Sequence, residues 1–331
     1  MAKSKKSPSK YVEKIRSLSF ERNLNDDELI ELTDITTIRA TGLPPHESAT
    51  AAFSATVVDQ AGNPVQGSIV SFAVSFVRPG GNWRSAGGMR ALYGRSGAKA
   101  ERLVNQGVIR VLGTVSSLTA STDSNGVATV TYRSSHIGSD LSQRVQAQEK
   151  ITATLSSGAK KESLINVGWT GLKQIAVTRG GLRVQGATGR HVIPDLNTFL
   201  KNLGKSVKDA GWPHPVTVTA AALKWGGQYP PHFTHKHGAT LDLRPMSTDG
   251  NPTWAKRDGT SKANYDFVRT KALITVLKDT GGKVKFNGKN TGGTYLAGHD
   301  NHIHVSWLTS AVTRPSTRTW SKIAAAVVKH A

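Results

Sequence analysis

The stretch "ATAAFSATVVDQAGNPVQGSIVSFAVSF", residues 49–76, decides the fold of the first half of the chain. On either side of its centre, apolar and polar residues alternate, as they do in a β-strand that buries one face. The centre carries Gly62, Asn63 and Pro64, which are residue types that favour turns. These residues therefore predict two strands joined by a turn.

Strand-like runs separated by turn residues continue along the chain. "ASTDSNGVATVTYRSS" (120–135) places a Ser-Asn-Gly turn before another run of Val, Thr and Tyr. "EKITATLSSG" (149–158) and "KESLINVGW" (161–169) complete the set. Several short strands at regular spacing predict an all-β sandwich over residues 45–168.

Two phrases of this region, "VVDQAGNPVQGSIVSFAV" (57–74) and "TDSNGVATVTYRSSHIG" (122–138), resemble bacterial immunoglobulin-like domains of the Big-1 (invasin and intimin) type. The resemblance implies an immunoglobulin-like sandwich that serves as a spacer or an adhesion module. The Gly/Arg-rich segment 78–108 does not fit the family's spacing. We expect it to be an insertion or an elaborated hairpin.

Residues 1–44 form a basic segment that we expect to be partly helical. A helix is predicted through "KYVEKIRSLSF" (10–20) and a helical turn through "NDDELIEL" (25–32). The basic start is not followed by the apolar run of a secretory signal peptide. We therefore expect synthesis in the cytoplasm without a classical signal, with this segment as a candidate docking or delivery element.

Composition sets the class of partner. The chain of 331 residues has 43 Lys and Arg against 22 Asp and Glu, a formal net charge of +21. Such a charge favours a polyanion, either nucleic acid or bacterial cell wall, unless it serves only solubility. No zinc-finger, RNP or basic-zipper pattern is present, so no specific nucleic-acid partner is expected. The absence of Cys excludes disulfides and thiolate metal ligands, and no apolar run is long enough to span a membrane.

Residues 169–331 mix helical and strand patterns without a regular βαβ repeat, which predicts an α+β domain. The chain as a whole is therefore expected to be multidomain. Helices are predicted at 193–211, 263–282 and 316–331, and strands at 214–227, 281–288 and 298–307.

The histidines of this second half form two groups. Six of the eleven lie between positions 232 and 304, in "HFTHKHGATLD" and "HDNHIH". His302 and His304 are two apart on a predicted strand, so both imidazoles project from one face. Such a pair suggests shared metal or proton chemistry, although a solvent-facing pair of strand histidines is the plainer alternative.

Asp242 is the candidate carboxylate ligand in the first histidine group. It lies in the alternating run "ATLDLRP", where Leu241 and Leu243 would face the core on the other side. A carboxylate in such a position needs a cation or hydrogen-bond donors. A zinc ion would meet that need if it were bound by the imidazole nitrogen of His235 and a carboxylate oxygen of Asp242.

The two groups together resemble the penicillin-insensitive murein endopeptidases, within the wider group of lysostaphin-type and D-Ala-D-Ala (LAS) metallopeptidases. The pattern runs from His232 through Gly238 to Asp242, then from Gly298 to His304. The resemblance implies a LAS-type zinc metallopeptidase domain over residues 169–331. It assigns the residues as follows: metal ligands His235, Asp242 and His304; catalytic His302, with His299 sharing that task or orienting the substrate; substrate-facing His232.

Lys224 and Trp225, in "LKWGGQYPPH", are further candidates to line the cleft and contact a substrate carboxylate. Surface and packing roles are the alternative for such a pair. The resemblance implies hydrolysis of peptidoglycan stem peptides, with D-Ala–diaminopimelate cross-links as the expected bond. The missing signal peptide would suit a phage lysin that acts after lysis, or an effector injected by a contractile secretion machine and countered by an immunity protein.

Other functions stay open. A D,D-carboxypeptidase or an L,D-endopeptidase on the same scaffold would use the same metal, and the pair His302 and His304 favours the endopeptidase. A non-catalytic protein that binds the cell wall or acts in adhesion is the alternative outside enzymes.

Overall fold

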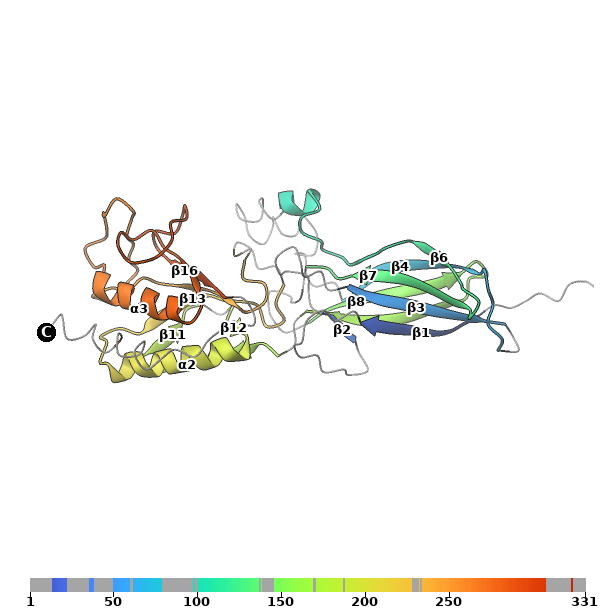
Figure 1. The fold of residues 1–331 in the computed structure, drawn as a ribbon, viewed down its shortest axis with the longest axis horizontal. Helices are drawn as coiled ribbons and strands as arrows, with labels where there is room; N and C mark the ends of the chain where they lie inside the picture. The colour runs from blue at the N-terminus through green and yellow to red at the C-terminus, as the bar shows by residue number, and fades with distance from the viewer. Residues whose placement is uncertain are drawn as a thin grey trace, which may run out of the picture.

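The chain forms two units joined end to end in an elongated molecule (Figure 1). The structure is a computed structural model. It describes residues 14–22, 36–38, 50–59, 62–78, 98, 101–136, 138, 146–168, 171–186, 188–227, 232, 234–307 and 323.

The first unit is a sandwich of two β-sheets. One sheet has the strand order β1 (Lys14–Arg22), β3 (Thr50–Val58), β7 (Val127–Arg133) and β5 (Thr114–Val115). The other has the order β2 (Thr36–Ile38), β9 (Lys160–Val167), β8 (Ala147–Leu155), β4 (Ile69–Arg78) and β6 (Thr119–Ser121).

These orders are those of an immunoglobulin fold, in which strands A, B, E and D form one sheet and G, F and C the other. Strands β1, β3, β7 and β5 correspond to A, B, E and D, and β9, β8 and β4 to G, F and C. The short β2 runs parallel to β9, while the other pairs of the sandwich are antiparallel. The prediction of an immunoglobulin-like sandwich is therefore confirmed.

The alternation that predicted the strands also builds the core. Along β3 every second side chain is buried, and Phe53 packs edge-on against Tyr132 of β7 with ring centroids 5.9 Å apart. The turn expected around Gly62 forms, with Asp59 accepting a hydrogen bond from the Asn63 backbone N–H. Within the segment 78–108, residues 101–105 are helical; residues 79–97, 99 and 100 lie outside the described part of the chain.

The helix predicted at residues 10–20 is wrong. The structure instead pairs β1 with β3, from Lys14 opposite Val58 to Arg22 opposite Ala51. The edge of β3 offers this segment a full row of backbone hydrogen bonds, and such tertiary pairing overrides a weak local helix preference. The helical turn predicted at 25–32 lies outside the described residues.

The second unit combines a five-stranded sheet with helices on one face. Its strand order is β11 (Leu182–Val184), β13 (Val216–Ala220), β14 (Thr240–Leu243), β16 (Ile303–Ser306) and β15 (Lys283–Lys285). Strands β11 and β13 are parallel and the other pairs antiparallel. A small two-stranded sheet, β10 (Lys173–Gln174) with β12 (His191–Val192), lies at its edge.

Two helices cover the apolar face of this sheet. Helix α2 (Pro194–Asp209) begins with a proline and ends before Gly211, whose φ of 67° suits glycine. Helix α3 (Phe267–Asp279) is capped by Asp266, which accepts a hydrogen bond from the Arg269 backbone N–H. Both helices confirm the predictions at 193–211 and 263–282. Of the helix predicted at 316–331 only Ile323 is described; it is helical and buried.

Each unit has its own hydrophobic core. The boundaries proposed near residues 44 and 168 stay predictions. Among the described residues, no helix is both long and apolar enough to cross a membrane.

Candidate metal centre

The site is built on two neighbouring strands. Asp242 in β14 lies directly opposite His304 in β16. On the other side of the sheet, Leu241 and Leu243 join the core under the helices, as the alternation predicted. Because β-strand side chains alternate between faces, Asp242 and His304 share the helix-free face.

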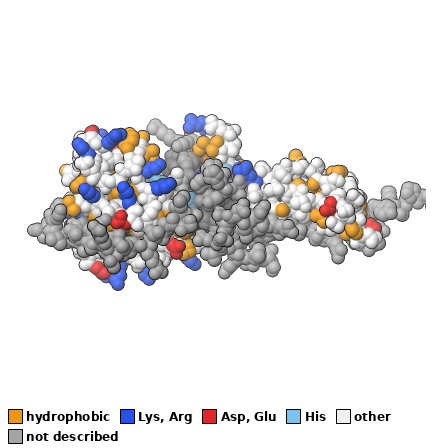
Figure 2. All heavy atoms as spheres, viewed as in Figure 1, with side chains coloured by type: hydrophobic (Ala, Val, Ile, Leu, Met, Phe, Trp, Pro, Cys, Tyr) orange, Lys and Arg blue, Asp and Glu red, His pale blue; other side chains and the backbone are white. Residues whose placement is uncertain are grey.

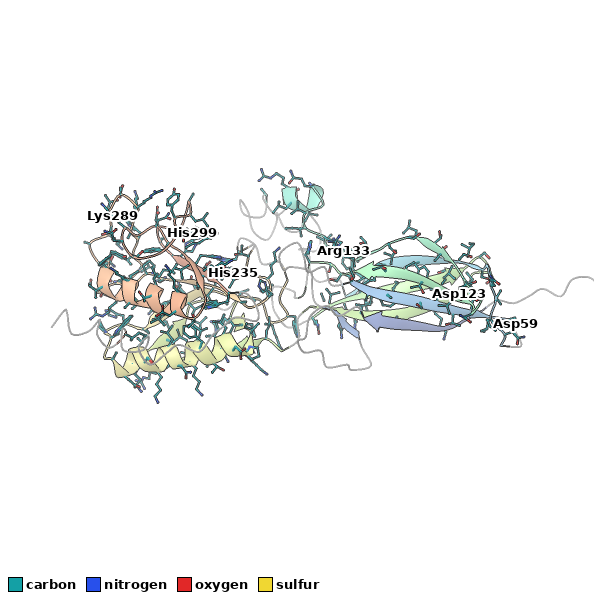
Figure 3. All side chains as sticks on the ribbon, in the orientation of Figure 1. Asp59, Asp123, Arg133, His235, Lys289 and His299 are labelled. Carbon is teal, nitrogen blue, oxygen red and sulfur yellow. The ribbon has the colours of Figure 1, made fainter. Side chains whose placement is uncertain are left out.

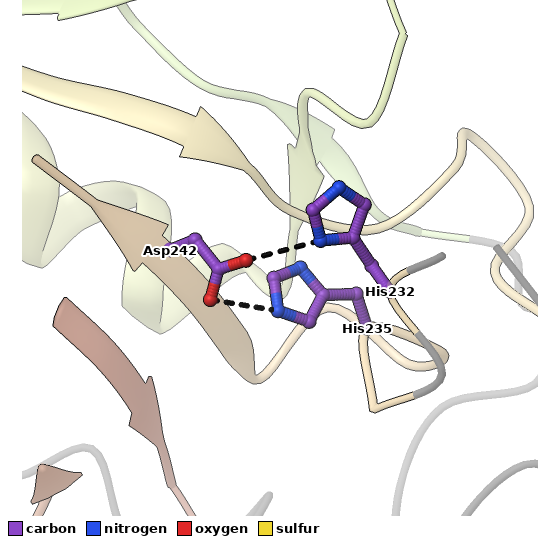
Figure 4. A group of neighbouring side chains, drawn as sticks. All are labelled: His232, His235 and Asp242. Carbon is purple, nitrogen blue, oxygen red and sulfur yellow. Dashed lines mark hydrogen bonds and ion pairs between the residues drawn. The ribbon is translucent and has the colours of Figure 1, made fainter. Parts of the chain in front are cut away.

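A loop before β14 adds two more histidines. His232 and His235 precede Gly238, whose φ of 81° is in the left-handed region that favours glycine. A Cβ at Gly238 would lie 2.6 Å from the Leu172 side chain, so a larger residue would push the loop away. The turn therefore holds both rings over Asp242, as Figure 4 shows.

Three imidazoles converge on the carboxylate of Asp242. His304 Nδ1 lies 2.9 Å and His235 Nε2 3.2 Å from the same oxygen, Oδ1. His232 Nδ1 lies 3.0 Å from the other oxygen, Oδ2. His235, Asp242 and His304 are 1%, 4% and 8% exposed, so the group is nearly dehydrated.

The cluster strongly shifts two ionisation equilibria. Burial alone would raise the pKa of Asp242, but hydrogen bonds with His232, His235 and His304 outweigh it and hold the pKa well below its usual range. Burial lowers the pKa of His235, and Asp242 only partly opposes that effect. An ionised carboxylate beside a neutral imidazole is the protonation state that a metal ion requires of its ligands.

Imidazole nitrogen and carboxylate oxygen, the donor atoms gathered here, are ligand types that zinc accepts. The ligand atoms of His232, His235 and Asp242 all lie within 4.8 Å of one another, and His304 joins them through Asp242. In a tetrahedral zinc site with bonds of about 2.0 to 2.1 Å, ligand atoms lie about 3.3 Å apart. The two contacts to Oδ1 are close to that spacing. Within the described part of the chain, His235 Nδ1 is buried without a hydrogen-bond partner, and its Nε2 is directed towards the cluster.

His302 and His299 stand beside this cluster. Their ring centroids are 4.5 Å apart, and that of His299 is 5.6 Å from His304. His302 Nδ1 lies 2.9 Å from Asn301 Oδ1, which leaves Nε2 available. Burial lowers the pKa of His302; the charge of Asp242 opposes this, and the neighbouring histidines reinforce it.

The cluster opens into a cleft of about 670 Å³. His232, Asp242 and His302 line it. The other lining residues are Gln185, Gly186, Thr219, Arg244, Pro252, Thr253 and Asn301. Arg244 was not predicted as a site residue, although it follows β14 directly and the alternation "DLR" indicates the same face as Asp242.

Lys224 and Trp225 lie beside the sandwich. Leu223, just before them, packs in the core of the sandwich. A Cβ at Gly138 of the sandwich would lie 2.1 Å from the Trp225 carbonyl oxygen. Neither Lys224 nor Trp225 is among the residues that line the cleft. The structure thus puts this pair at the junction of the two units, and their contact with a substrate stays a prediction.

Figure 3 places His235 on the side of its unit that faces the sandwich. It also places Arg133 at the near end of the sandwich, with Asp59 and Asp123 at the far end. The predicted metal ligands therefore lie near the junction.

No family model matches the chain, and no curated protein does. Among solved structures, the D00-D0 domain of intimin aligns at 17% identity over 45% of this chain and 43% of that one, with a TM-score of 0.22. The D0-D1 domain of intimin aligns at 12% identity over 90% and 86%, with a TM-score of 0.27. The Yersinia pseudotuberculosis adhesin InvE aligns at 11% identity over 82% and 49%, with a TM-score of 0.23. At these TM-scores the likeness does not establish a common fold.

Proposed function

We propose that this protein is a zinc-dependent peptidoglycan hydrolase that cleaves peptide cross-links, with the D-Ala–diaminopimelate amide as the expected bond. One observation carries the proposal: a buried carboxylate, Asp242, meets three imidazole nitrogens within 3.2 Å beside an open cleft. A purely structural role would not require so many titratable groups at the mouth of a cleft.

The ligand set that we propose is His235, Asp242 and His304. His235 and His304 approach the same carboxylate oxygen, whereas His232 contacts the other and would hold the carboxylate in place. Three protein ligands leave a fourth position for water or substrate, as in catalytic zinc sites. When bound, zinc lowers the pKa of its water towards 7 and polarises the scissile carbonyl.

His302 is the proposed general base. Its Nδ1–H donates to Asn301 Oδ1, so the unprotonated Nε2 can accept a proton. Its lowered pKa keeps the ring neutral, and therefore basic, at neutral pH. His299, whose ring centroid lies 4.5 Å from that of His302, would share the proton or orient the substrate. The five-stranded sheet, with proposed ligands on β14 and β16, is the reason that we expect this unit to have the LAS-type peptidase fold.

The surface charge suits an anionic wall polymer. Figure 2 shows Lys and Arg side chains spread over the visible face of the unit that carries the histidines, with few Asp or Glu among them. The formal net charge of +21 points the same way. The same proposal includes action at the cell wall, which the protein would reach by lysis or by injection. It also includes an immunity protein as a partner.

Digestion of purified diaminopimelate-type peptidoglycan tests it, with mass spectrometry of the released muropeptides. The protein is assayed as purified, after chelation and after zinc is restored. Conversion of cross-linked dimers to monomers, lost on chelation and rescued by zinc, would support the proposal. Loss of only the terminal D-Ala would indicate a D,D-carboxypeptidase, and cleavage at an L,D bond an L,D-endopeptidase. Binding to sacculi without any cleavage would make the non-catalytic wall-binding function the better one.

A further inference from the structure

The cleft is lined by a guanidinium that pairs with no other described side chain. Arg244 lines the same cleft as His232, Asp242 and His302. Its backbone N–H donates to the Thr217 carbonyl, but its half-buried side chain makes no hydrogen bond or ion pair with the described residues. An arginine side chain is seldom buried unless it contacts a carboxylate, a phosphate or the face of an aromatic ring.

The sheet places Arg244 at a defined distance from the proposed zinc ligands. Asp242 and Arg244 are two residues apart, at the end of β14, and so point to the same face. At about 3.4 Å per residue, their Cα atoms are separated by roughly 7 Å. An arginine side chain can cover that separation, so its guanidinium can reach a substrate bound at the metal.

A second guanidinium reinforces the first. Arg183, on β11, is held by its Nε–H to Thr217 Oγ1 at 2.7 Å and by a terminal N–H to the Gly250 carbonyl at 3.2 Å. Arg183 and Arg244 border the same small hollow. Two like charges held together in this way create a positive potential that an anion would relieve.

We propose that Arg244, with Arg183 beside it, binds a carboxylate of the peptide substrate and so selects substrates that carry one close to the scissile amide. The inference rests on the proposed function and names the substrate feature. In a D-Ala–diaminopimelate cross-link, the carbon that bears the scissile nitrogen also bears a carboxylate. A planar guanidinium can hold a carboxylate through two parallel hydrogen bonds, which fixes orientation as well as position.

Equilibrium binding tests this with two matched probes, N-acetyl-D-Ala-D-Ala and its C-terminal carboxamide. Both are titrated calorimetrically into the zinc-loaded, full-length chain carrying His302→Ala, and NMR checks that the probes stay intact. We expect the acid to bind about tenfold or more tightly than the amide, because charge-assisted hydrogen bonds are lost with the carboxylate. Adding Arg244→Gln should remove that preference. Arg244→Lys, which keeps the charge but not the fork, should keep only part of it.

Arg257→Gln is the matched control, because Arg257 lies in a separate cleft over the ring of Tyr295. It should leave the preference unchanged, and zinc content and thermal unfolding verify that each variant is folded. Equal binding of acid and amide by the parent chain, or an intact preference after Arg244→Gln, would overturn the inference. If the preference depends on Arg244 while peptidoglycan stays cross-linked, the inference stands and the proposed hydrolase function fails.

Discussion

At the scale of single residues, Asp242 organises the candidate site. Its two carboxylate oxygens divide the surrounding imidazoles, with His235 and His304 on Oδ1 and His232 on Oδ2. That division separates proposed zinc ligands from a residue that only orients a ligand. The difference is measurable because direct ligands and their hydrogen-bond partners contribute differently to metal affinity.

We predict that His304→Ala lowers zinc affinity by more than about 100-fold, whereas His232→Ala lowers it by about 10- to 100-fold. Competition with a chromogenic chelator measures both. His214→Ala is the control, since the His214 side chain hydrogen-bonds the Thr248 carbonyl and does not line the cleft of the histidine cluster. If His232→Ala loses zinc and His304→Ala retains it, the ligand set would instead be His232, His235 and Asp242.

For the reaction itself, His302→Ala should abolish peptidoglycan cleavage while zinc stays bound. The His302 side chain contacts Asn301 and the tilted ring of His299, whereas the histidines that contact the Asp242 carboxylate are His232, His235 and His304. Muropeptide release and bound zinc are measured on the same preparation. Normal digestion by the variant would remove His302 from the proposed mechanism.

His136, in the sandwich, predicts a pH dependence of stability. Burial, followed by the charges of Arg110 and Lys236, lowers its pKa to about 3. The unfolded state, with a pKa near 6.5, takes up a proton first as pH falls. The stability from neutral His136 is therefore complete above pH 6.5 and is lost between about pH 6.5 and 3.

Urea unfolding at pH 7.5 and 4.5 tests this. The free energy of unfolding should fall by up to about 2 to 3 kcal/mol, since one pKa unit corresponds to 1.36 kcal/mol. His136→Gln can still accept the hydrogen bond from the Arg110 N–H but cannot titrate. The variant should lose less stability than the wild type over this range, and an equal loss would contradict the prediction.

At the scale of elements, the start of helix α3 depends on one buried carboxylate. Asp266 accepts a hydrogen bond from the Arg269 backbone N–H and forms an ion pair with the guanidinium of the same residue. Asp266→Ala would remove the cap and leave a buried arginine unpaired. We predict a loss of about 3 to 5 kcal/mol in the free energy of unfolding.

Asp266→Asn is the matched control, because an amide oxygen keeps the cap while the charge is lost. It should be destabilised less than Asp266→Ala in urea unfolding. Equal stability of Asp266→Ala and the wild type would show that the ion pair contributes nothing to α3.

At the scale of the whole molecule, the two units meet through a close backbone approach. A Cβ at Gly138 would lie 2.1 Å from the Trp225 carbonyl oxygen and 2.8 Å from that of Gly226. Real Cβ atoms do not come so close, so Gly138→Ala should push the units apart. We predict lower thermal stability and a larger maximum dimension in small-angle X-ray scattering.

Gly158→Ala is the comparison variant for this prediction. It lies in a turn with a φ of 85°, and a Cβ there meets no atom within 4 Å. It should therefore show only the local cost of a non-glycine residue at positive φ. If Gly138→Ala changes neither dimension nor stability more than Gly158→Ala does, the backbone contact does not hold the units together.

The sequence by itself determined strands β3, β4, β7, β8 and β9 of the sandwich and both central helices of the second unit. Apolar alternation around Phe53 and the turn residues after Asp59 need only local geometry. The same logic placed Asp242 opposite the core residues Leu241 and Leu243, and the spacing of the histidines marked them as a cluster.

Only the tertiary structure decided what depends on contacts between distant residues. The segment predicted as a helix at 10–20 became β1 because the edge of β3 was there to pair with it. Lys224 and Trp225 are not among the residues that line the cleft, and Leu223 beside them packs in the core of the sandwich, a contact that the sequence pattern did not indicate. Arg244 lines the cleft because the pairing of β13, β14 and β16 sets which side chains share a face with the proposed metal ligands. Local preferences determine the periodicity of apolar residues along a helix or strand. Which segment pairs with a strand edge, or packs on a sheet face, depends on burial and hydrogen bonding across the whole fold.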